Sequence, residues 1–418
     1  MIRITEQSLV NGNVSAIRRN FVEMEQSQRR LSTGQRVQYP HQDVYSAVNS
    51  IFYRTRISSI DQFSKNIDDA KGMLDVADGA LSSMTQVLQR SRELAVMGAN
   101  GTLAKEDRVT IATEVNELLE RAYELSMTKH KDEFIFGGTK STTDPFRTFY
   151  QWNESMGKQI MVGVNYEGGG SGKKREIEEN QYINASIPGN YAFWGTNSEL
   201  ISGKDASTFV AAADSKIMID DTVISLHAGD NIDAVVEKIN AANTNVKAGI
   251  AVLRDGSKVL RLESFEPHKI MIQDIEGGRV FQDLGLIREG MANFPENNYH
   301  PSAGVGGKSV FESLMYLRDS LLRNDEAQVG KTSLGLIDAG LSNILHTQAK
   351  LSAAVSHIDN ASKGLADQKV FVSEAMSKNE DVDYASEIVN FTMWEYAHKA
   401  SLQTAAKLLQ PTLMDFLR

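Results

Sequence analysis

Residues 60–95, IDQFSKNIDDAKGMLDVADGALSSMTQVLQRSRELA, decide the fold class of this chain. Apolar residues recur there every seven positions, and a second set follows three positions after each of the first four. Such a pattern, kept for about five heptads, is typical of a helix in a coiled coil. The stretch therefore predicts one long helix with an apolar stripe that needs a partner, formed by Ile60, Ile67, Leu74, Leu81, Leu88 and Ala95 with Phe63, Ala70, Ala77 and Met84 between them.

A matching stripe lies near the other end of the chain. Its members are again seven residues apart and are Ile344, Leu351, Ile358, Leu365 and Val372. A single stripe of this kind usually packs on the core of its own domain. Two stripes separated by a non-helical insert predict in addition that the two helices pair antiparallel and form a rod within each molecule.

Shorter apolar stripes mark the two terminal segments. The first runs to a break at Ser32-Thr33-Gly34, and the second belongs to a last helix around 384–409. A narrow stripe on a short helix buries too little surface to be stable alone. We therefore predict that neighbouring molecules cover these stripes on assembly, through Val10, Val14, Ile17, Phe21, Met24 and Leu31 at one end and Ile388, Phe391, Leu402 and Leu409 at the other.

The prolines separate helical ends from a different middle. Only Pro40 lies within 1–140 and only Pro411 within 302–418, whereas the other five lie between. Because proline breaks helix interiors, the middle is predicted to be rich in strands. Alternating apolar residues around Asp220-Asp221 and again over 249–262 predict two hairpins, with Asp230 as the N-cap of a helix between them. These elements make a small α+β unit near 214–288, preceded by irregular strands and loops over 145–200.

The predicted fold class is therefore α+β and multidomain. Long N- and C-terminal helices form an antiparallel coiled coil or helical bundle, and a strand-rich domain is inserted between them. A further helix follows Asn100-Gly101, with Thr102 as its N-cap. The expected parts are an N-terminal assembly helix (1–40), the first part of the helical rod (41–140), the outer domain (141–305), the second part of the rod (306–380) and a C-terminal assembly helix (381–418).

Composition limits the classes of function. The chain has 418 residues, a net charge of −10 and no cysteine, so disulfides and thiolate sites are excluded. Nucleic acid and anionic lipid both need a basic face, which an acidic chain disfavours. No run reaches the roughly 18 apolar residues of a membrane span, and no secretory signal is readable at the N-terminus. We expect no nucleic-acid partner and no membrane insertion.

Motifs for catalysis or metal binding are not found in the sequence. Gly168-Gly-Gly-Ser-Gly-Lys173 lacks the first glycine and the final hydroxyl residue of a phosphate-binding loop, so a flexible surface loop is predicted. None of the eight histidines pairs with another at a four-residue spacing. We therefore expect no catalytic residue, no metal, no cofactor and no enzyme activity.

Several motifs at the two ends of the chain resemble the bacterial flagellin family. Arg30-Leu-Ser-Thr-Gly-Gln-Arg36 is similar to the family's turn between its first two helices, and 100–115 is similar to the start of its third helix. Phe134-Ile-Phe-Gly-Gly-Thr-Lys140 and the C-terminal segments 380–387 and 405–417 resemble the branch of hook–filament junction proteins, hook-associated protein 3.

The resemblance covers roughly 1–146 and 308–418, and 214–288 is similar to a small insert module of the family. Residues 37–43, VQYPHQD, depart from the small residues that are usual after the first turn.

The resemblance implies a structural protein that joins hook to filament and is needed for filament assembly. Its implied partners are hook-associated protein 1, flagellin, further copies of itself in a ring, and an export chaperone at the C-terminal helix. The implied location is the bacterial flagellum, reached by type III export, outside the cell or in the periplasm where flagella are internal. Two alternatives stay open, a flagellin that builds the filament and another type III-secreted coiled-coil protein.

Overall fold

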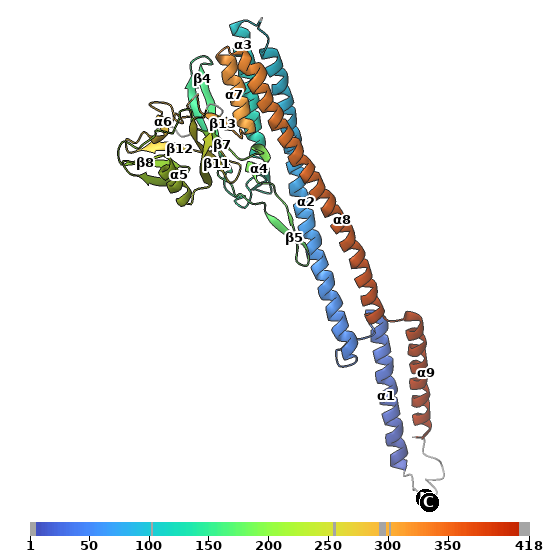
Figure 1. Cartoon of the computed structure of the whole chain (residues 1–418). Coiled ribbons are helices and arrows are strands. Elements are labelled where there is room, and N and C mark those ends of the chain that lie inside the picture. The colour runs from blue at the N-terminus through green and yellow to red at the C-terminus, as the bar shows by residue number, and fades with distance from the viewer. Residues whose placement is uncertain (1–5, 102, 254–255, 292–297, 301, 409–418) are drawn as a thin grey trace, which may run out of the picture. The chain divides into compact units, whose positions relative to one another are not determined.

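The long helices predicted from the heptads are present, and each extends beyond its apolar stripe. The first is α2 (Val44–Gly98) and the second is α8 (Leu334–Glu380). The computed structural model describes residues 6–101, 103–253, 256–291, 298–300 and 302–408, without the side chains of 6–10 and 408 (Figure 1). Two compact units emerge, unit 1 (1–65 and 361–418) and unit 2 (66–360).

Unit 1 is entirely helical in its described part, apart from two short connections. It contains α1 (Glu6–Thr33), the start of α2, the end of α8 and α9 (Tyr384–Leu408). α2 begins well before the heptad stripe because Asp43 accepts a hydrogen bond from the Ser46 amide at 3.0 Å, as an N-cap does. The predicted helical ends of the chain are thereby confirmed.

Within unit 2, ion pairs fix α2 and α8 in antiparallel alignment. Lys71 pairs with Asp359 at 2.6 Å and Arg92 with Asp338 at 2.7 Å. Lys71 and Arg92 are 21 residues apart on α2, and their partners are 21 residues apart on α8 in the opposite direction. The predicted rod residues of this unit are all buried: Ile67, Leu74, Leu81, Leu88, Ile344, Leu351 and Ile358. The predicted fold class, with its long antiparallel helices, is confirmed.

Two shorter helices complete the bundle of unit 2. They are α3 (Lys105–Ser126) and α7 (Val310–Leu322), and the π-helix η1 (Gln328–Ser333) leads from α7 into α8. The predicted N-cap Thr102 lies outside the described residues. Ala104 precedes α3 and has no side chain that could cap it, so the prediction of a threonine cap was wrong.

Two fully buried arginines hold this end of unit 2 together. Arg108, 1% exposed, donates to the carbonyls of Gly98 (3.3 Å) and Asn100 (3.2 Å) and pairs with Glu326 at 2.5 Å. Arg318, fully buried, donates to the Asn116 side chain at 3.0 Å and to the Met161 carbonyl at 2.7 Å. A buried guanidinium is tolerated when its charge and donors are compensated. Arg318 Nη2 makes no hydrogen bond among the described residues, but it lies 2.8 Å from Asp319 Oδ1 in an ion pair. The turn from α2 to α3 and the packing of α7 are thereby fixed.

The segment after α3 forms paired strands. Strands β1 (Lys129–His130) and β2 (Glu133–Phe134) pair, as do β3 (Phe146–Asn153) with β4 (Lys158–Tyr166) and β5 (Lys174–Glu178) with β6 (Gln181–Asn184). β3 and β4 run antiparallel over their whole length with one irregularity at Phe149/Tyr150. The predicted irregular strands are therefore present: β5 and β6 also shift register, between Glu176 and Glu178, and such bulges interrupt the alternation of apolar residues.

The glycine-rich loop is a close crossing of two chain segments rather than a free loop. A Cβ on Gly169 would lie 2.0 Å from the Thr139 hydroxyl, and one on Gly138 would lie 2.1 Å from the Gly169 carbonyl. The Gly169 amide donates to the Gly137 carbonyl at 2.9 Å. The prediction of a flexible surface loop was therefore wrong: the glycines allow two backbones to touch.

A cluster of aromatic rings forms the core beside this crossing. Phe193 of the short helix α4 (Gly189–Phe193) lies 4.9 Å from Phe136, 5.6 Å from Phe146 and 5.5 Å from Phe311 between ring centroids. These distances suit edge-to-face packing, which favours aromatic pairs beyond the area they bury. The cluster joins the 134–140 motif to β3, α4 and α7.

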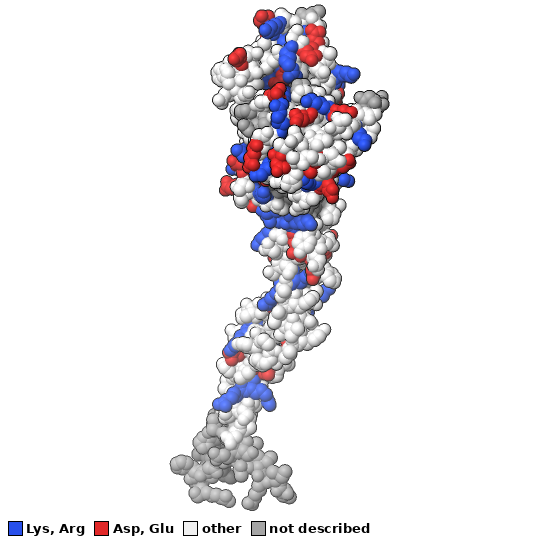
Figure 2. Space-filling model, turned by 60° about the vertical axis from the view of Figure 1, so that its left-hand side comes forward, with Lys and Arg blue, Asp and Glu red and all other residues white. Residues whose placement is uncertain are grey.

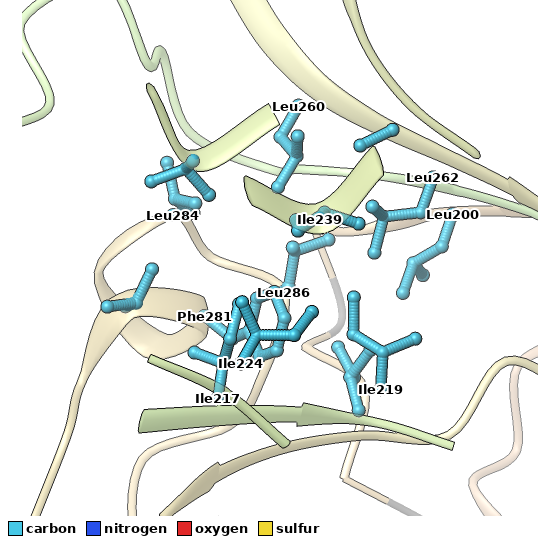
Figure 3. Close-up of a cluster of buried hydrophobic side chains, with 14 of the residues drawn as sticks. Leu200, Ile217, Ile219, Ile224, Ile239, Leu260, Leu262, Phe281, Leu284 and Leu286 are labelled. Atoms are coloured by element: carbon cyan, nitrogen blue, oxygen red, sulfur yellow. The ribbon is translucent and has the colours of Figure 1, made fainter. Parts of the chain in front are cut away.

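The small α+β unit has a separate core within unit 2. One sheet has the order β10–β11–β7–β13 and the other β12–β8–β9. The strands are β7 (Glu199–Ile201), β8 (Ser215–Ile219), β9 (Thr222–Leu226), β10 (Val246–Val252), β11 (Lys258–Ser264), β12 (Ile272–Ile275) and β13 (Gly304–Gly306). Helices α5 (Ile232–Ala241) and α6 (Val280–Asp283) accompany them, and side chains such as Ile217, Ile239 and Phe281 meet inside (Figure 3).

Both predicted hairpins of this α+β unit are confirmed, as β8–β9 and β10–β11. The predicted cap of α5 is displaced by one residue. Asn231 accepts from the Ala234 amide at 2.9 Å, and Asp230 instead forms an ion pair with Lys238. Both side chains can cap a helix, so the sequence alone did not separate them.

We expect Leu351→Ala to lower the free energy of unfolding of the helical rod by about 2–5 kcal/mol, because it leaves a cavity in a buried heptad layer. Urea unfolding followed by helical circular dichroism measures this loss. Leu345→Ala on the exposed side of the same helix is the matched control and should cost under about 0.5 kcal/mol. Equal losses in the two variants would contradict the assigned packing.

Candidate assembly surface

Helices α1 and α9 of unit 1 lie side by side and pair antiparallel (Figure 1). Asn20 donates to the Ser401 hydroxyl at 2.8 Å and to the Ala397 carbonyl at 3.3 Å. Further along α1, Ser27 is fully buried and donates to the Glu387 carbonyl at 3.4 Å. Partner numbers fall on α9 as they rise on α1, which defines the antiparallel pairing.

An ion pair between Arg30 and Glu387 closes one end of this helix pair. Arg30 Nε and Nη2 both donate to Glu387 Oε1, at 2.9 and 2.7 Å. Burial acts to raise the pKa of Glu387, but hydrogen bonds from Arg30 and Ser27 outweigh it and hold the pKa below its ordinary value. The carboxylate therefore stabilises the pair in its charged form.

The two short connections of unit 1, between α1 and α2 and between α8 and α9, contact each other. Gln35 and Asp381 form an isolated β-bridge, and the Val382 amide donates to the Gly34 carbonyl at 2.9 Å. Gly34 has φ +73°, and a Cβ there would lie 2.9 Å from the Tyr384 hydroxyl. Only glycine fits this conformation without strain. This requirement explains the glycine of the Arg30–Arg36 turn in physical terms.

The structure places the predicted assembly residues on two sides of the α1–α9 pair. On α1, Ile17, Met24 and Leu31 are half-buried, whereas Val14 and Phe21 are exposed. On α9, Phe391 is half-buried, whereas Ile388 and Leu402 are exposed. The side chain of Val10 and the whole of Leu409 lie outside the described residues. The predicted stripe is therefore divided between an internal contact and a free face.

The free face of α9 carries more apolar side chains than the prediction named. Tyr384, Val389, Met393 and Tyr396 are all exposed, together with Ile388 and Leu402. Unit 1 holds less than a third of the chain but more than half of the exposed large apolar side chains of the described residues. Contiguous exposed apolar surface of this kind marks an interaction site.

A second exposed stripe lies at the start of α2 and was missed from the sequence. Its side chains are 59–78% exposed and are Val44, Tyr45, Val48, Ile51 and Phe52. Their spacing repeats the i, i+4, i+7, i+8 pattern of one helix face, so the signal was present. The sequence prediction assigned this segment to the rod, where the stripe from Ile60 onwards does belong. Val370 and Phe371 of α8 are likewise exposed.

The remaining predicted rod residues also fall in unit 1. Ile60 and Leu365 are buried, and Val372 is half-buried. Lys369 pairs with Asp61 at 2.6 Å, and Glu380 accepts hydrogen bonds from Gln35 and Arg54. The α2–α8 pairing thus continues in this unit, next to the exposed stripes.

Charge differs sharply between the two units. Unit 1 contains 15 Lys and Arg against 13 Asp and Glu, whereas unit 2 contains 29 against 41. The net charge of −10 therefore comes from unit 2. Uncharged atoms and scattered basic residues dominate the described surface of unit 1 on the face drawn in Figure 2. This surface favours apolar association with little electrostatic opposition.

The described residues show no group of three or more His, Asp and Glu side chains arranged to hold a metal ion. Across the same residues, no helix combines the length and apolar character that a bilayer crossing requires. The exposed helical surface of unit 1 is therefore the candidate functional site.

Sequence models of one protein family match both ends of the chain. The model of the bacterial flagellin N-terminal helical region matches residues 4–141, and that of the flagellin C-terminal helical region matches 334–417. A model of the flagellin hook IN motif matches 201–256, within the small α+β unit. The two helical matches together cover α1 to α3 and α8 to α9.

Individual proteins from several bacteria are similar to the chain. Flagellin D of Vibrio anguillarum is 24% identical over 97% of this chain and 94% of its own length. Flagellin C of Vibrio cholerae is 25% identical, with 96% of each chain covered. Among solved structures, flagellar hook associated protein-3 of Legionella pneumophila has a TM-score of 0.45 at 18% identity, covering 78% of this chain and 98% of its own. A putative flagellar hook-associated protein of Vibrio parahaemolyticus has a TM-score of 0.46 at 15% identity, covering 81% and 100%.

The Arg30–Glu387 pair gives unit 1 a defined pH dependence. A lowered pKa means that the pair contributes stability above the unfolded carboxyl pKa and loses it as the pH falls through the folded value. We expect Glu387→Gln to lower the melting temperature at about pH 7, and we expect this deficit to shrink as the pH falls below the ordinary carboxyl pKa. Glu395→Gln, which removes an exposed ion pair with Lys399, is the control and should change little. A Glu387→Gln deficit that is independent of pH would contradict this assignment.

The α2 stripe provides a separate test of the assembly surface. Phe52→Asp should leave the melting temperature of the monomer within about 2 °C, because the side chain is 64% exposed. The same change should abolish association between molecules, since it places a charge in an apolar contact. Sedimentation velocity and circular dichroism measure the two effects. Loss of helix in the monomer, or unchanged association, would remove the stripe from the surface.

Proposed function

The chain belongs to the bacterial flagellin family, and we propose on that premise that it is the adaptor between hook and filament. Membership makes the chain a structural component of the flagellum. The junction role is narrower: a molecule of this kind would bind the hook-side proteins below and the first filament subunits above. Its contribution to motility would be mechanical, and no step of bond chemistry is proposed.

The observation that carries the assembly role is the uncovered apolar surface of unit 1. Side chains such as Tyr45, Phe52, Val389 and Tyr396 are exposed, and no described part of the chain covers them. Burying apolar surface between molecules releases about 25 cal/mol per Å² before the cost of association is subtracted. Stripes on α1, α2, α8 and α9 would therefore be covered by neighbouring copies in a ring.

The 134–140 motif favours the junction role over the filament role. This segment resembles the junction branch of the family in its sequence, Phe-Ile-Phe-Gly-Gly-Thr-Lys. Its residues are held firmly, because Phe136 packs on Phe193 and Gly138 meets Gly169. The motif thus supports the base of the outer domain, and a difference there would change how the outer domain (141–305) is presented to neighbours.

The implied partners follow from this role. Hook-associated protein 1 would lie on the hook side and flagellin on the filament side, with further copies of the chain completing the ring. Export through the flagellar type III channel would require the C-terminal helix to be kept from premature association. The exposed face of α9 is the surface that an export chaperone would cover.

A filament subunit is the second candidate. Flagellins of two Vibrio species align with this chain over nearly the whole of both sequences, which favours this alternative. The two candidates predict different amounts of protein, because a filament contains its subunit in great excess over any junction protein.

Deleting the gene in its host separates the candidates. We expect hook–basal bodies without filaments in electron micrographs, together with flagellin that is secreted but unassembled, because its seat on the hook is missing. Re-expression of the intact gene is the control and should restore filaments. Loss of the principal filament protein itself would establish the flagellin alternative. Normal filaments would overturn both roles.

A further inference from the structure

A surface groove runs beside α8 within unit 2. It has a volume of about 420 Å³, and the residues that form it include Trp194, Gly195, Lys308, Leu336, Gly340 and Asn343. The floor is apolar or small, because Leu336 and Gly340 lie one turn apart on α8. Gly195 has φ +75° at the turn that borders the groove, and a Cβ there would meet Asn343 at 2.4 Å.

Two polar groups of this groove, Trp194 Nε1–H and the Lys308 ammonium, have no acceptor among the described residues. Trp194 is 3% exposed, and its Nε1–H has no hydrogen-bond partner. Among the described residues Lys308 forms no ion pair, and its ammonium lies over the Tyr316 ring, 4.2 Å from the centroid. Burial lowers its pKa, although the charge of Glu312 acts to raise it. None of the described residues that line the groove is Asp or Glu. A poorly solvated cation in an apolar groove without a carboxylate in its described lining favours a ligand that brings a carboxylate on an apolar body.

The β3–β4 hairpin of the same chain carries that chemistry at its tip. Trp152 is 62% exposed, and Glu154, two residues further on, is exposed and makes no hydrogen bond or ion pair in the described part of the chain. Gly157 completes the turn with φ +61° and open space around it. An exposed tryptophan beside a free carboxylate is a typical anchor for a protein contact.

Two hydrogen bonds hold the hairpin on α3, the second of them at its tip, where Lys158 pairs in register with Asn153. Tyr150 donates to Glu120 of α3 at 3.2 Å, and Lys158 donates to Glu117 at 2.6 Å. The other exposed hairpin turn, between β5 and β6, is a weaker match for the groove. Its aromatic residue is Tyr182, and its carboxylates Glu178 and Glu179 already interact within the chain.

We propose that the groove beside α8 receives the β3–β4 tip of a second copy of this chain. The Glu154 carboxylate neutralises Lys308, while the Trp152 ring covers Leu336 and Gly340. Each copy offers one groove and one tip, formed by different residues, so the contact is head-to-tail and suits a closed ring. The inference rests on the proposed function, since it requires that copies of the chain assemble.

The absence of cysteine from the chain allows a direct test by disulfide trapping. Glu154→Cys combined with Ser342→Cys, on the rim of the groove, should give interchain dimers and higher species when flagellar junctions isolated from the host are oxidised. Glu154→Cys with Ser352→Cys is the matched control: Ser352 is exposed on the same helix about 15 Å away. Crosslinks in the first pair alone support the contact. Equal crosslinking in both pairs, or none in assembled junctions, overturns it.

A double-mutant cycle covers the case in which the cysteine pair prevents assembly. Glu154→Ala and Lys308→Ala should each reduce the amount of chain in isolated junctions by about tenfold, and the double variant should reduce it no further, because both remove the same interaction. Multiplying effects would overturn the contact. Glu179→Ala is the control and should be neutral. If the parent chain itself were missing from isolated junctions, the proposed function would fail instead.

Discussion

The seven-residue register between α2 and α8 is the constraint on which the rest of unit 2 depends. Equal steps along the two helices, seen in the Lys71–Asp359 and Arg92–Asp338 pairs, define the antiparallel alignment. The buried heptad residues occupy one stripe on each helix, so a shift by one residue would expose them. With that alignment set, everything between α2 and α8 must leave and return at one end of the pair. The buried arginines Arg108 and Arg318 stabilise this end.

Unit 1 is also built from helices, but they contact one another in a different way. Its helices meet through Asn20, Ser27 and the Arg30–Glu387 pair, and much of its apolar surface stays outside. Polar contacts define the direction and register of the helix pair and leave the apolar faces of the helices exposed. A molecule built in this way holds its helices in a specific arrangement and keeps surface free for neighbours. The exposed stripes are consistent with a protein whose stable form is the assembled one.

Heptad spacing was enough to predict the helical ends, the antiparallel pairing and the buried rod residues. It was insufficient for the Gly168–Gly172 loop, because close backbone contact with Thr139 depends on a segment distant in sequence. The stripe from Val44 to Phe52 has a helical period but gives no sign of whether the chain covers it. Tertiary contact decides that, and the structure leaves it exposed. The predicted cap of α5, Asp230, was wrong because the adjacent Asn231 is equally suitable and is the residue that caps the helix.

The distribution of charge determines where association can begin. Copies of unit 2 carry 41 acidic against 29 basic residues and therefore repel one another at low ionic strength, whereas unit 1 is close to neutral. Apolar burial in unit 1 has to supply the driving force, because hydrophobic association does not depend on sign of charge. A contact between two copies of the acidic unit 2 must then pair a negative charge with a positive one, because a contact between like charges would increase the repulsion. A groove with a lone cation and no carboxylate is the kind of feature that permits such a contact within an acidic surface.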